Sequence, residues 1–438
     1  MSKLPWWDPA QLAQALAARF GQQGLVWLDG DGSKLGRWAL LAVAPTRVER
    51  CVGLPGGYGS RDPFALLQEC FQATAVGTWL GWLAYEAGAW VEPGEHWQSP
   101  DMALLWAGHY EAVLHLDLQQ RELHIAGAGA LQKDLEDLLV AGPAPGTHQL
   151  EGELGDPAGS GENAWHWHTP SQRFGDQVRQ VREWIGSGDL FQANLTACAE
   201  QRRQQPLDPL GLYLRLRSSC PAPFGGLIVA DATEAVLSAS PERFLQLTSA
   251  GAVETRPIKG TRPRHSDPLQ DAAAAAELIT SAKDRAENVM IVDLLRNDLG
   301  RVCVPGSIEV PQLLGLESYA QVHHLTSVVT GQLRAELGVV DLLRACWPGG
   351  SITGAPKIRA CQRLNSLEPL PRGPYCGSFF RRDADGSFDS NILIRSVLLR
   401  QGRLRVHGGC GIVADSQPAQ EAEELSWKVQ PLLAALGR

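Results

Sequence analysis

Long apolar runs, paired cysteines and an excess of positive charge are all missing from this sequence of 438 residues. Its longest apolar stretch, Trp38 to Ala44, is far short of the ~20 residues that span a bilayer. The N-terminal stretch MSKLPWWDPAQLAQ lacks the apolar core of a secretory signal. The nine cysteines are scattered singly, without a CxxC pair, which excludes a dense disulfide framework. These absences predict a cytoplasmic protein with reduced thiols and no membrane contact.

The charge balance excludes one broad class of function. The formal net charge is −9, whereas a general nucleic-acid binder depends on clustered lysine and arginine. An anionic small molecule is not excluded, because a local basic pocket can lie inside an acidic protein. With 44% hydrophobic and 20% charged residues, the composition is that of an ordinary globular protein. The expected partner is therefore a small molecule and not a nucleic acid.

The composition divides the chain into two lobes. Residues 1–140 mix short β-like runs with a helix that starts at Pro9, where Asp8 is suited to the N-cap. Residues 141–164 are rich in glycine, proline and acidic residues without periodicity, which indicates a loop or linker. Residues 165–438 alternate strands and helices irregularly and contain the motifs with chemical character. The pattern predicts an α+β fold with large, mostly antiparallel β-sheets and not a regular βαβ series.

Two glycine-rich segments are candidates for binding an anion. CWPGGSITGAPKIRACQRL places glycines and small hydroxyl residues before a helix expected to begin near Pro356, where exposed N–H groups attract anions. RVHGGCGIVADS places Gly408, Gly409 and Gly411 after a strand, where successive N–H groups can cradle a carboxylate. A helix-entry loop and a β-bulge or tight turn are the structural alternatives. Cys410, with no nearby base in the sequence, is expected to be inert.

Three glutamates are candidates for holding a metal ion. Glu421 and Glu424 lie three residues apart in a predicted helix and therefore share one face, while Glu423 points elsewhere. Glu287, in the predicted helix DRAENVMIVDLLRND, is the candidate third carboxylate. Carboxylate oxygens, completed by water and a substrate anion, suit Mg²⁺. A solvated helix face is the alternative for each glutamate.

Lys259 stands in the segment ETRPIKGTRPR, between Arg256 and Arg262. A lysine on a solvated face does not need the Pro-Ile and Gly-Thr pairs that frame this one. A lysine that acts as a nucleophile must be neutral, and both neighbouring positive charge and burial favour the neutral amine. The segment therefore makes Lys259 a candidate nucleophile, with steering of an anionic substrate as the alternative.

Together these segments resemble the chorismate-utilising enzymes, a family that includes the large subunits of anthranilate synthase and aminodeoxychorismate synthase and the isochorismate synthases. The resembling text includes GDLFQANL, SPERF, TRPIKGTRPR, AENVMIVDLLRNDLGRV, VHHLTS, GGSITGAPKIRA, GPYCGS, NILIRS, GIVADS and the closing Glu-x-x-Glu helix. These motifs follow the family's order between about Phe174 and Leu433. The resemblance implies chorismate as substrate and two large, mostly antiparallel β-sheets packed face to face with surrounding helices, as in anthranilate synthase component I.

The same resemblance implies the residues of the site. It implies Mg²⁺ held by Glu287 and Glu424, with Glu421 close by, against the ring carboxylate of chorismate. The residues that match the family's substrate contacts are Gln192, Thr261, His324, Thr353, Tyr375, Arg395 and the backbone at Gly409 and Gly411. An arginine such as Arg395 suits a bidentate contact with the second carboxylate of chorismate.

Two positions indicate a branch of the family. The water-using isochorismate and salicylate synthases carry a basic lysine at the position of Gln192, and glutamine cannot act as that base. Lys259 stands in PIKGT, as in the aminodeoxychorismate synthases, where anthranilate synthases have alanine. The resemblance therefore implies amination at C4 of chorismate through a covalent Lys259 intermediate, with Glu242 of SPERF as the acid for the departing hydroxide. The implied pathway is the synthesis of para-aminobenzoate and folate.

Two rival functions stay open at this point. The large subunit of anthranilate synthase is the alternative enzyme. A non-catalytic sensor with a ligand pocket in the first lobe, near LVWLDG, is the alternative from another class, although a sensor would be expected to lose Glu242, Glu287 or Lys259. No cysteine here stands in the Gly-x-Cys-x-Gly-x-Gln setting of a glutaminase, so a separate glutaminase subunit is expected to deliver the ammonia.

Two segments, HGGCGIV and SFFRRDADG, depart from the family's usual sequence.

Overall fold

The computed structural model describes residues 4–74, 76–142, 164–319 and 322–437. The predicted linker, residues 141–164, lies almost wholly outside these ranges, since 143–163 are not described. Within the described ranges, no helix is both long enough and apolar enough to cross a membrane.

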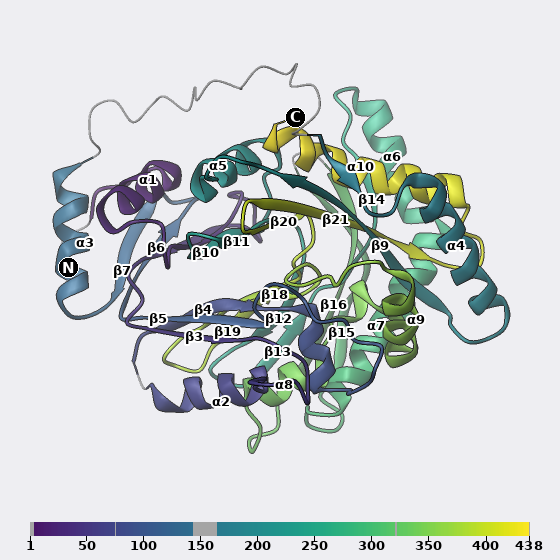
Figure 1. Cartoon of the computed structure of the whole chain (residues 1–438), viewed down its shortest axis with the longest axis horizontal. Coiled ribbons are helices and arrows are strands. Elements are labelled where there is room, and N and C mark those ends of the chain that lie inside the picture. The colour runs from purple at the N-terminus through teal and green to yellow at the C-terminus, as the bar shows by residue number, and fades with distance from the viewer. Residues whose placement is uncertain (1–3, 75, 143–163, 320–321, 438) are drawn as a thin grey trace.

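The architecture is built on two large β-sheets that lie face to face (Figure 1). The first contains, in spatial order, β17 (Gly354–Ala355), β9 (Gln192–Arg202), β21 (Arg403–Ile412), β20 (Ser396–Arg400), β11 (Glu234–Ser240), β10 (Phe224–Asp231), β1 (Val26–Asp29), β2 (Trp38–Ala42), β6 (Ala112–Asp117) and β7 (Glu122–Gly127), with β8 (His166–Trp167) beside β9. The second contains β14 (Ile258–Pro263), β16 (Val322–Gln332), β13 (Ala252–Thr255), β12 (Arg243–Leu247), β19 (Phe388–Asn391), β18 (Ser378–Arg382), β4 (Thr78–Leu83), β5 (Leu105–Tyr110) and β3 (Arg47–Cys51), with β15 (Glu309–Ser318) beside β16. Neighbouring strands in the described chain are antiparallel, for example β9 with β21 and β14 with β16. The predicted α+β fold with two antiparallel sheets is confirmed.

The predicted first lobe, residues 1–140, contributes strands to both sheets. In the first sheet β1 pairs with β10, and in the second β4 pairs with β18. The strands before the linker and those after it are therefore hydrogen-bonded into common sheets. The two lobes are separate in the sequence, but in the structure their residues pack into one common core.

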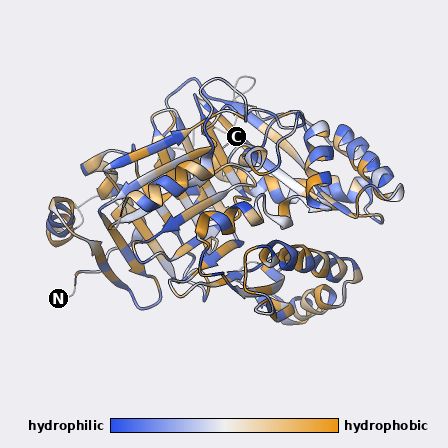
Figure 2. Cartoon of the chain, turned by 90° about the horizontal axis from the view of Figure 1, so that it is seen from below, coloured by the Kyte–Doolittle hydropathy of each residue, from blue (hydrophilic) through white to orange (hydrophobic). Residues whose placement is uncertain are grey.

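Helices cover the outer faces of the two sheets (Figure 1). The first sheet packs against α1 (Pro9–Phe20), α3 (Ala130–Ala141), α4 (Ser171–Gly186), α5 (Pro209–Ser219) and α10 (Pro418–Leu436). The second sheet packs against α2 (Pro63–Ala73), α6 (Pro268–Thr280), α7 (Ala282–Gly300) and α8 (Val339–Cys346). The helix α9 (Lys357–Leu367) packs against β9 and β17 of the first sheet, and the short 3₁₀ helices are η1 (Tyr85–Trp90) and η2 (Gly350–Ile352). Figure 2 shows that apolar residues run through the strands, whereas the helices alternate apolar and polar sides.

Side-chain alternation explains why both faces of the first sheet are buried. Val26 of β1 joins the core between the sheets, and the next residue, Trp27, points to the other side. There the Trp27 ring meets Tyr213 of α5 edge to face, with ring centroids 5.2 Å apart. Local signals set the helix ends as predicted, because Asp8 accepts a hydrogen bond from the Ala10 N–H at the start of α1.

Candidate active site

Three functional side chains from distant parts of the chain converge on Gly411 of β21. A Cβ placed on Gly411 would lie 2.8 Å from Gln192 Nε2, 3.0 Å from Glu287 Oε2 and 3.5 Å from Lys259 Nζ. Gln192 opens β9, Glu287 lies on α7 and Lys259 lies on β14. A side chain at position 411 would press on the ends of the Gln192 and Glu287 side chains, so glycine leaves room for them here. The gap between the sheets thus places an amide, a carboxylate and an amine together.

Buried polar atoms without partners surround this point. Gln192 is fully buried, and neither its Oε1 nor its Nε2 has a hydrogen-bond partner among the described residues. Glu287 Oε1 is also buried and unpartnered within that same part of the chain. Each such atom costs on the order of 1–3 kcal/mol unless something bonds to it. Their convergence indicates a site built for a polar ligand.

A β-bulge positions Lys259. The pairing of β14 with β16 is irregular between Ile258 and Thr261, and Gly260 has a φ of 85°. A non-glycine residue rarely adopts that conformation, and a bulge redirects the neighbouring side chain. The Pro-Ile-Lys-Gly segment therefore forms a bulge that sets the direction of the Lys259 side chain.

Ser351 connects Lys259 to the predicted acid, Glu242. Lys259 Nζ donates to the Ser351 carbonyl at 3.2 Å, and the Ser351 side chain hydrogen-bonds to the Glu242 carboxyl. Burial raises the pKa of Glu242 to about 7, against the opposing effects of Ser351 and Lys259. Glu242 can therefore carry a proton near neutral pH. Sequence reasoning missed Ser351, although the GGSITG loop that holds it was singled out.

The two arginines beside Lys259 do not act as the positive neighbours that the sequence suggested. Arg256 pairs with Glu317 at 2.7 Å, and Arg262 pairs with Glu277 at 3.0 Å. The charged groups that Lys259 influences are instead carboxylates, including Glu242 and Glu287. Glu242, which shares Ser351 with Lys259, is the nearby carboxyl able to exchange a proton.

A second group lies around His324 on β16. The Nδ1 atom of His324 is 2.9 Å from Thr261 Oγ1. Burial and the nearby charge of Arg395 lower the pKa of His324 to about 3, so the ring is neutral at physiological pH. Arg395 has a φ of 51°, and no carboxylate of the described chain stands among the groups acting on its guanidinium. An unpaired, half-buried guanidinium is suited to an anionic ligand.

The remaining predicted contacts line the same region. His407, Gly409 and Gly411 alternate along β21 and therefore share one face of the first sheet. Tyr375 stacks on His407 with ring centroids 5.0 Å apart, which places it over that face. The Thr353 hydroxyl donates its proton to the Gly349 carbonyl at 2.9 Å, so in this structure only its lone pairs can accept a hydrogen bond from a ligand.

Two lysines that sequence reasoning missed accompany the glutamates of α10. Lys283 Nζ lies 2.9 Å from Glu421 Oε1, and Lys428 Nζ lies 2.7 Å from Glu424 Oε1. The spacing of Lys428, four residues after Glu424, is the signal that could have revealed its pair. Each glutamate keeps a second oxygen, and Glu421 Oε2 is buried without a partner among the described residues.

The donors that lie close enough for one metal ion differ in part from the predicted set. Ligand atoms of Glu421, Glu424 and Cys410 all lie within 4.8 Å of one another. Glu287 is outside this close set, although its carboxyl is near enough to feel the charges of Lys283 and Glu421. Burial raises the pKa of the Cys410 thiol to about 12, so it is protonated at neutral pH and does not act as a nucleophile. The free carboxylate oxygens fit a hard divalent cation.

A buried arginine holds one wall of the site in place. Arg372 is 1% exposed and donates to the carbonyls of Ile352 and Asn194, each at 2.8 Å. The Asn194 N–H in turn donates to the Thr353 carbonyl at 2.7 Å. The charge of Arg372 is balanced by Glu368, 2.7 Å away. Removing one partner of such a buried pair is strongly destabilising, so this network makes the wall rigid.

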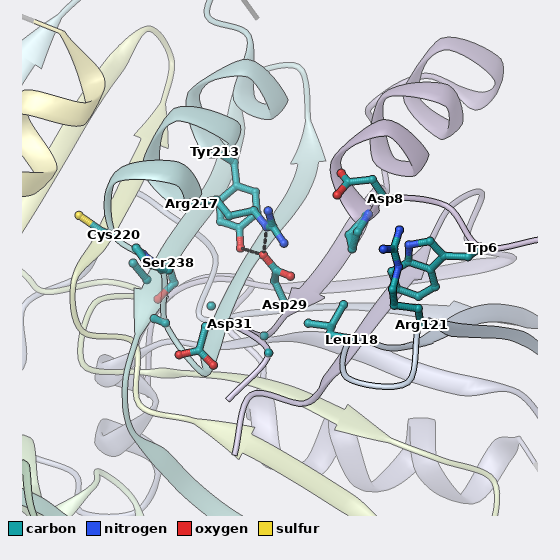
Figure 3. Close-up of a pocket in the computed structure, with 17 residues that line it drawn as sticks. Trp6, Asp8, Asp29, Asp31, Leu118, Arg121, Tyr213, Arg217, Cys220 and Ser238 are labelled. Atoms are coloured by element: carbon teal, nitrogen blue, oxygen red, sulfur yellow. Dashed lines mark hydrogen bonds and ion pairs between the residues drawn. The ribbon is translucent and has the colours of Figure 1, made fainter. Parts of the chain in front are cut away.

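A separate cavity of about 450 Å³ opens in the first sheet near Asp29 (Figure 3). Its Asp29 carboxylate accepts from Tyr213 at 3.1 Å and from Arg217 at 2.5 Å, so the acid is already paired. Trp6 and Arg121 line the opposite end. None of the candidate catalytic residues lines this cavity. A pocket thus lies near LVWLDG, lined by residues of both lobes and apart from the converging groups around Gly411.

Comparisons with known proteins agree with this geometry. A family model described as chorismate binding enzyme matches residues 58–434. Over 338 residues the chain is 43% identical to aminodeoxychorismate synthase component 1 of Klebsiella aerogenes, covering 77% of this chain and 71% of that protein. It is 46% identical over 276 residues to the protein of the same name from Salmonella typhimurium, covering 63% of this chain and 60% of the relative. The solved structure of anthranilate synthase component I from Streptococcus pneumoniae superposes with a TM-score of 0.77 at 29% identity, covering 90% of this chain and 92% of that one.

Proposed function

The chain belongs to the family of chorismate-binding enzymes, and from this premise we propose that it is the large subunit of an aminodeoxychorismate synthase. The proposed reaction converts chorismate and ammonia into 4-amino-4-deoxychorismate and water. One observation carries the proposal: the Lys259 amine lies with Gln192 and Glu287 at Gly411 and shares Ser351 with Glu242. The anthranilate synthase alternative has less support, since the two bacterial relatives at 43% and 46% identity carry the aminodeoxychorismate synthase name.

The proposed chemistry consists of two displacements. The neutral amine of Lys259 attacks C2 of chorismate, the two conjugated ring double bonds each shift by one position, and the C4 hydroxyl leaves as water with a proton from Glu242. Ammonia then attacks C4, both double bonds shift back, the C2–nitrogen bond to Lys259 breaks, and a proton from the new ammonium group returns to Glu242. Glu242 suits the acid role because its raised pKa, about 7, keeps a proton available near neutral pH. Gln192 is neutral and cannot act as the base that water needs. The incoming nucleophile is therefore ammonia and not water.

The proposed substrate contacts follow from the unpaired groups. Chorismate carries two carboxylates, and the unpaired guanidinium of Arg395, with the backbone at Gly409 and Gly411, suits one of them. Neutral His324 can donate or accept a hydrogen bond without adding charge. Mg²⁺ held by Glu287, Glu421 and Glu424 would neutralise the other carboxylate, and the unpartnered oxygens of Glu287 and Glu421 support that assignment.

Removal of the proposed metal ligands should abolish most of the activity. Glu424→Ala should lower turnover at fixed Mg²⁺ by at least about tenfold, since even the loss of an outer-shell partner costs that much in metal sites. Glu423→Ala, an exposed neighbour on the same helix, is the control and should retain activity. Full turnover of the wild type in excess EDTA would rule out the Mg²⁺ assignment.

The source of ammonia is the second part of the proposal. The relatives are named component 1, which implies a second component. We infer that this partner is a separate glutaminase subunit, because the sequence has no glutaminase motif. The product would then serve para-aminobenzoate and folate synthesis.

Chromatography of the product is the experiment that tests this function. The purified chain should convert chorismate with ammonium salts at raised pH into aminodeoxychorismate, because free ammonia becomes abundant there. With glutamine as the sole nitrogen source it should form no product. Anthranilate as the main product would favour the alternative enzyme, and steady turnover from glutamine without a second protein would contradict the separate glutaminase.

A further inference from the structure

Cys410 faces away from the substrate side of β21. Gly409 and Gly411 point into the gap between the sheets, and by strand alternation the Cys410 side chain points to the opposite face. The thiol is fully buried there and donates a weak hydrogen bond to the Glu421 carbonyl on α10 at 3.4 Å. The proposed substrate chemistry makes no use of this sulfur.

The sulfur lies close to two carboxylates. Its Sγ, one carboxylate oxygen of Glu421 and one of Glu424 are all within 4.8 Å of one another. Lys283 and Lys428 each occupy only the Oε1 atom of their glutamate. Glu421 itself is 2% exposed, and its Oε2 has no hydrogen-bond partner among the described residues. A buried thiol beside a buried, unsatisfied carboxylate oxygen is a donor set suited to a cation.

We infer that Cys410, Glu421 and Glu424 form a binding site for a thiophilic divalent cation, of the class of Zn²⁺ and Cd²⁺. One sulfur and two carboxylate ligands, completed by water, suit such an ion, whereas Mg²⁺ takes oxygen ligands and leaves the thiol protonated. On binding, a metal–sulfur bond forms and the thiol proton passes to solvent. No change of oxidation state is involved.

This site would share Glu421 and Glu424 with the proposed Mg²⁺ site. A thiophilic cation would therefore compete with Mg²⁺ and inhibit the enzyme. The competition rests on the proposed function, but the binding itself depends only on the three side chains. The two are therefore tested by separate measurements.

The binding test is a titration of the purified, reduced full-length chain with Cd²⁺ or Co²⁺, without chorismate. The wild type should develop a sulfur-to-metal charge-transfer band in the ultraviolet. Cys410→Ala should lack the band and bind Zn²⁺ at least about tenfold more weakly by calorimetry, since a direct ligand is lost. Cys410→Ser preserves size and tests the donor itself. Cys70→Ala, which removes another buried cysteine, and Glu423→Ala should leave the band unchanged.

The possible outcomes separate the two claims. If the wild type shows no charge-transfer band, or if the Cys410 variants keep it, the inferred site is overturned whatever the enzyme's activity. If the band appears and depends on Cys410 while chorismate is not converted, the metal site stands and the proposed function fails. In an active enzyme, Cys410→Ala should raise the Zn²⁺ concentration for half-inhibition by at least about tenfold at fixed Mg²⁺.

Discussion

Incubated with chorismate and no ammonia, the wild-type chain should gain the mass of chorismate less one water. Without an incoming amine the second displacement cannot occur, so the bond between Lys259 and the substrate persists. Trypsin does not cleave after a modified lysine or before proline. The adduct should therefore appear on the peptide Phe244–Arg264, whose internal arginines both precede proline. Intact-protein and peptide mass spectrometry, with rapid quenching for a short-lived adduct, measure this directly.

Substitutions at Lys259 distinguish a nucleophile from a substrate-steering charge. Lys259→Ala should abolish the adduct and lower aminodeoxychorismate formation by at least about a thousandfold, since the covalent route is lost. Lys259→Arg should not restore activity, because a guanidinium stays protonated at working pH. Residual amination at C2 is expected in Lys259→Ala, since the pocket would then resemble that of the alanine-bearing enzymes.

The steering alternative makes opposite predictions for the same variants. If Lys259 only attracts the carboxylates of chorismate, arginine would partly replace it, and alanine would chiefly raise KM. Lys133→Ala, at an exposed position of α3, is the matched control and should keep both the adduct and the turnover. An active wild-type enzyme that forms no adduct under rapid quenching would contradict the covalent mechanism.

The second large effect is expected at Glu242. Glu242→Gln keeps the shape of the side chain but cannot give a proton to the departing hydroxide, so adduct formation should slow by about 10²–10⁴-fold. Because burial raises the pKa of Glu242 to about 7, the acid form prevails below that value. The rate of adduct formation in the wild type should therefore fall as pH rises above about 7.

Single-turnover rates without ammonia are the appropriate measurement, since the ionisation of ammonia then does not enter. Ser351→Ala removes the hydrogen bond that lowers the pKa of Glu242, so the fall in rate should move to higher pH. A Glu242→Gln variant with an unchanged rate would exclude the acid role.

The same shift has a consequence for stability. Folding raises the pKa of Glu242 from its ordinary value of 4.5 to about 7, so the folded state prefers the neutral carboxyl. The stability that this preference contributes is fully present below the unfolded value and is lost as pH rises through about 7. Glu242→Gln should remove this part of the pH dependence, as measured by denaturant unfolding.

Local signals in the sequence were sufficient for several features. Asp8 before Pro9 marked the start of α1, where its side chain accepts a hydrogen bond from the Ala10 N–H. The ordered motifs identified the family and, through it, the two antiparallel sheets. These features are readable because caps, turns and motif text depend on residues that are close together in the chain.

Only the tertiary structure decided how the distant residues meet. Gln192, Lys259 and Glu287 reach Gly411 from separate strands and a helix, and no local pattern encodes which strands become neighbours. The role of Ser351 between Lys259 and Glu242, and the engagement of Arg256 by Glu317, became visible only there. The physical reason is that antiparallel pairing across hundreds of residues follows from burying both faces of the sheets in one common core. The chemical groups of the site can be read from the sequence, and the packing of the two sheets decides which of them touch.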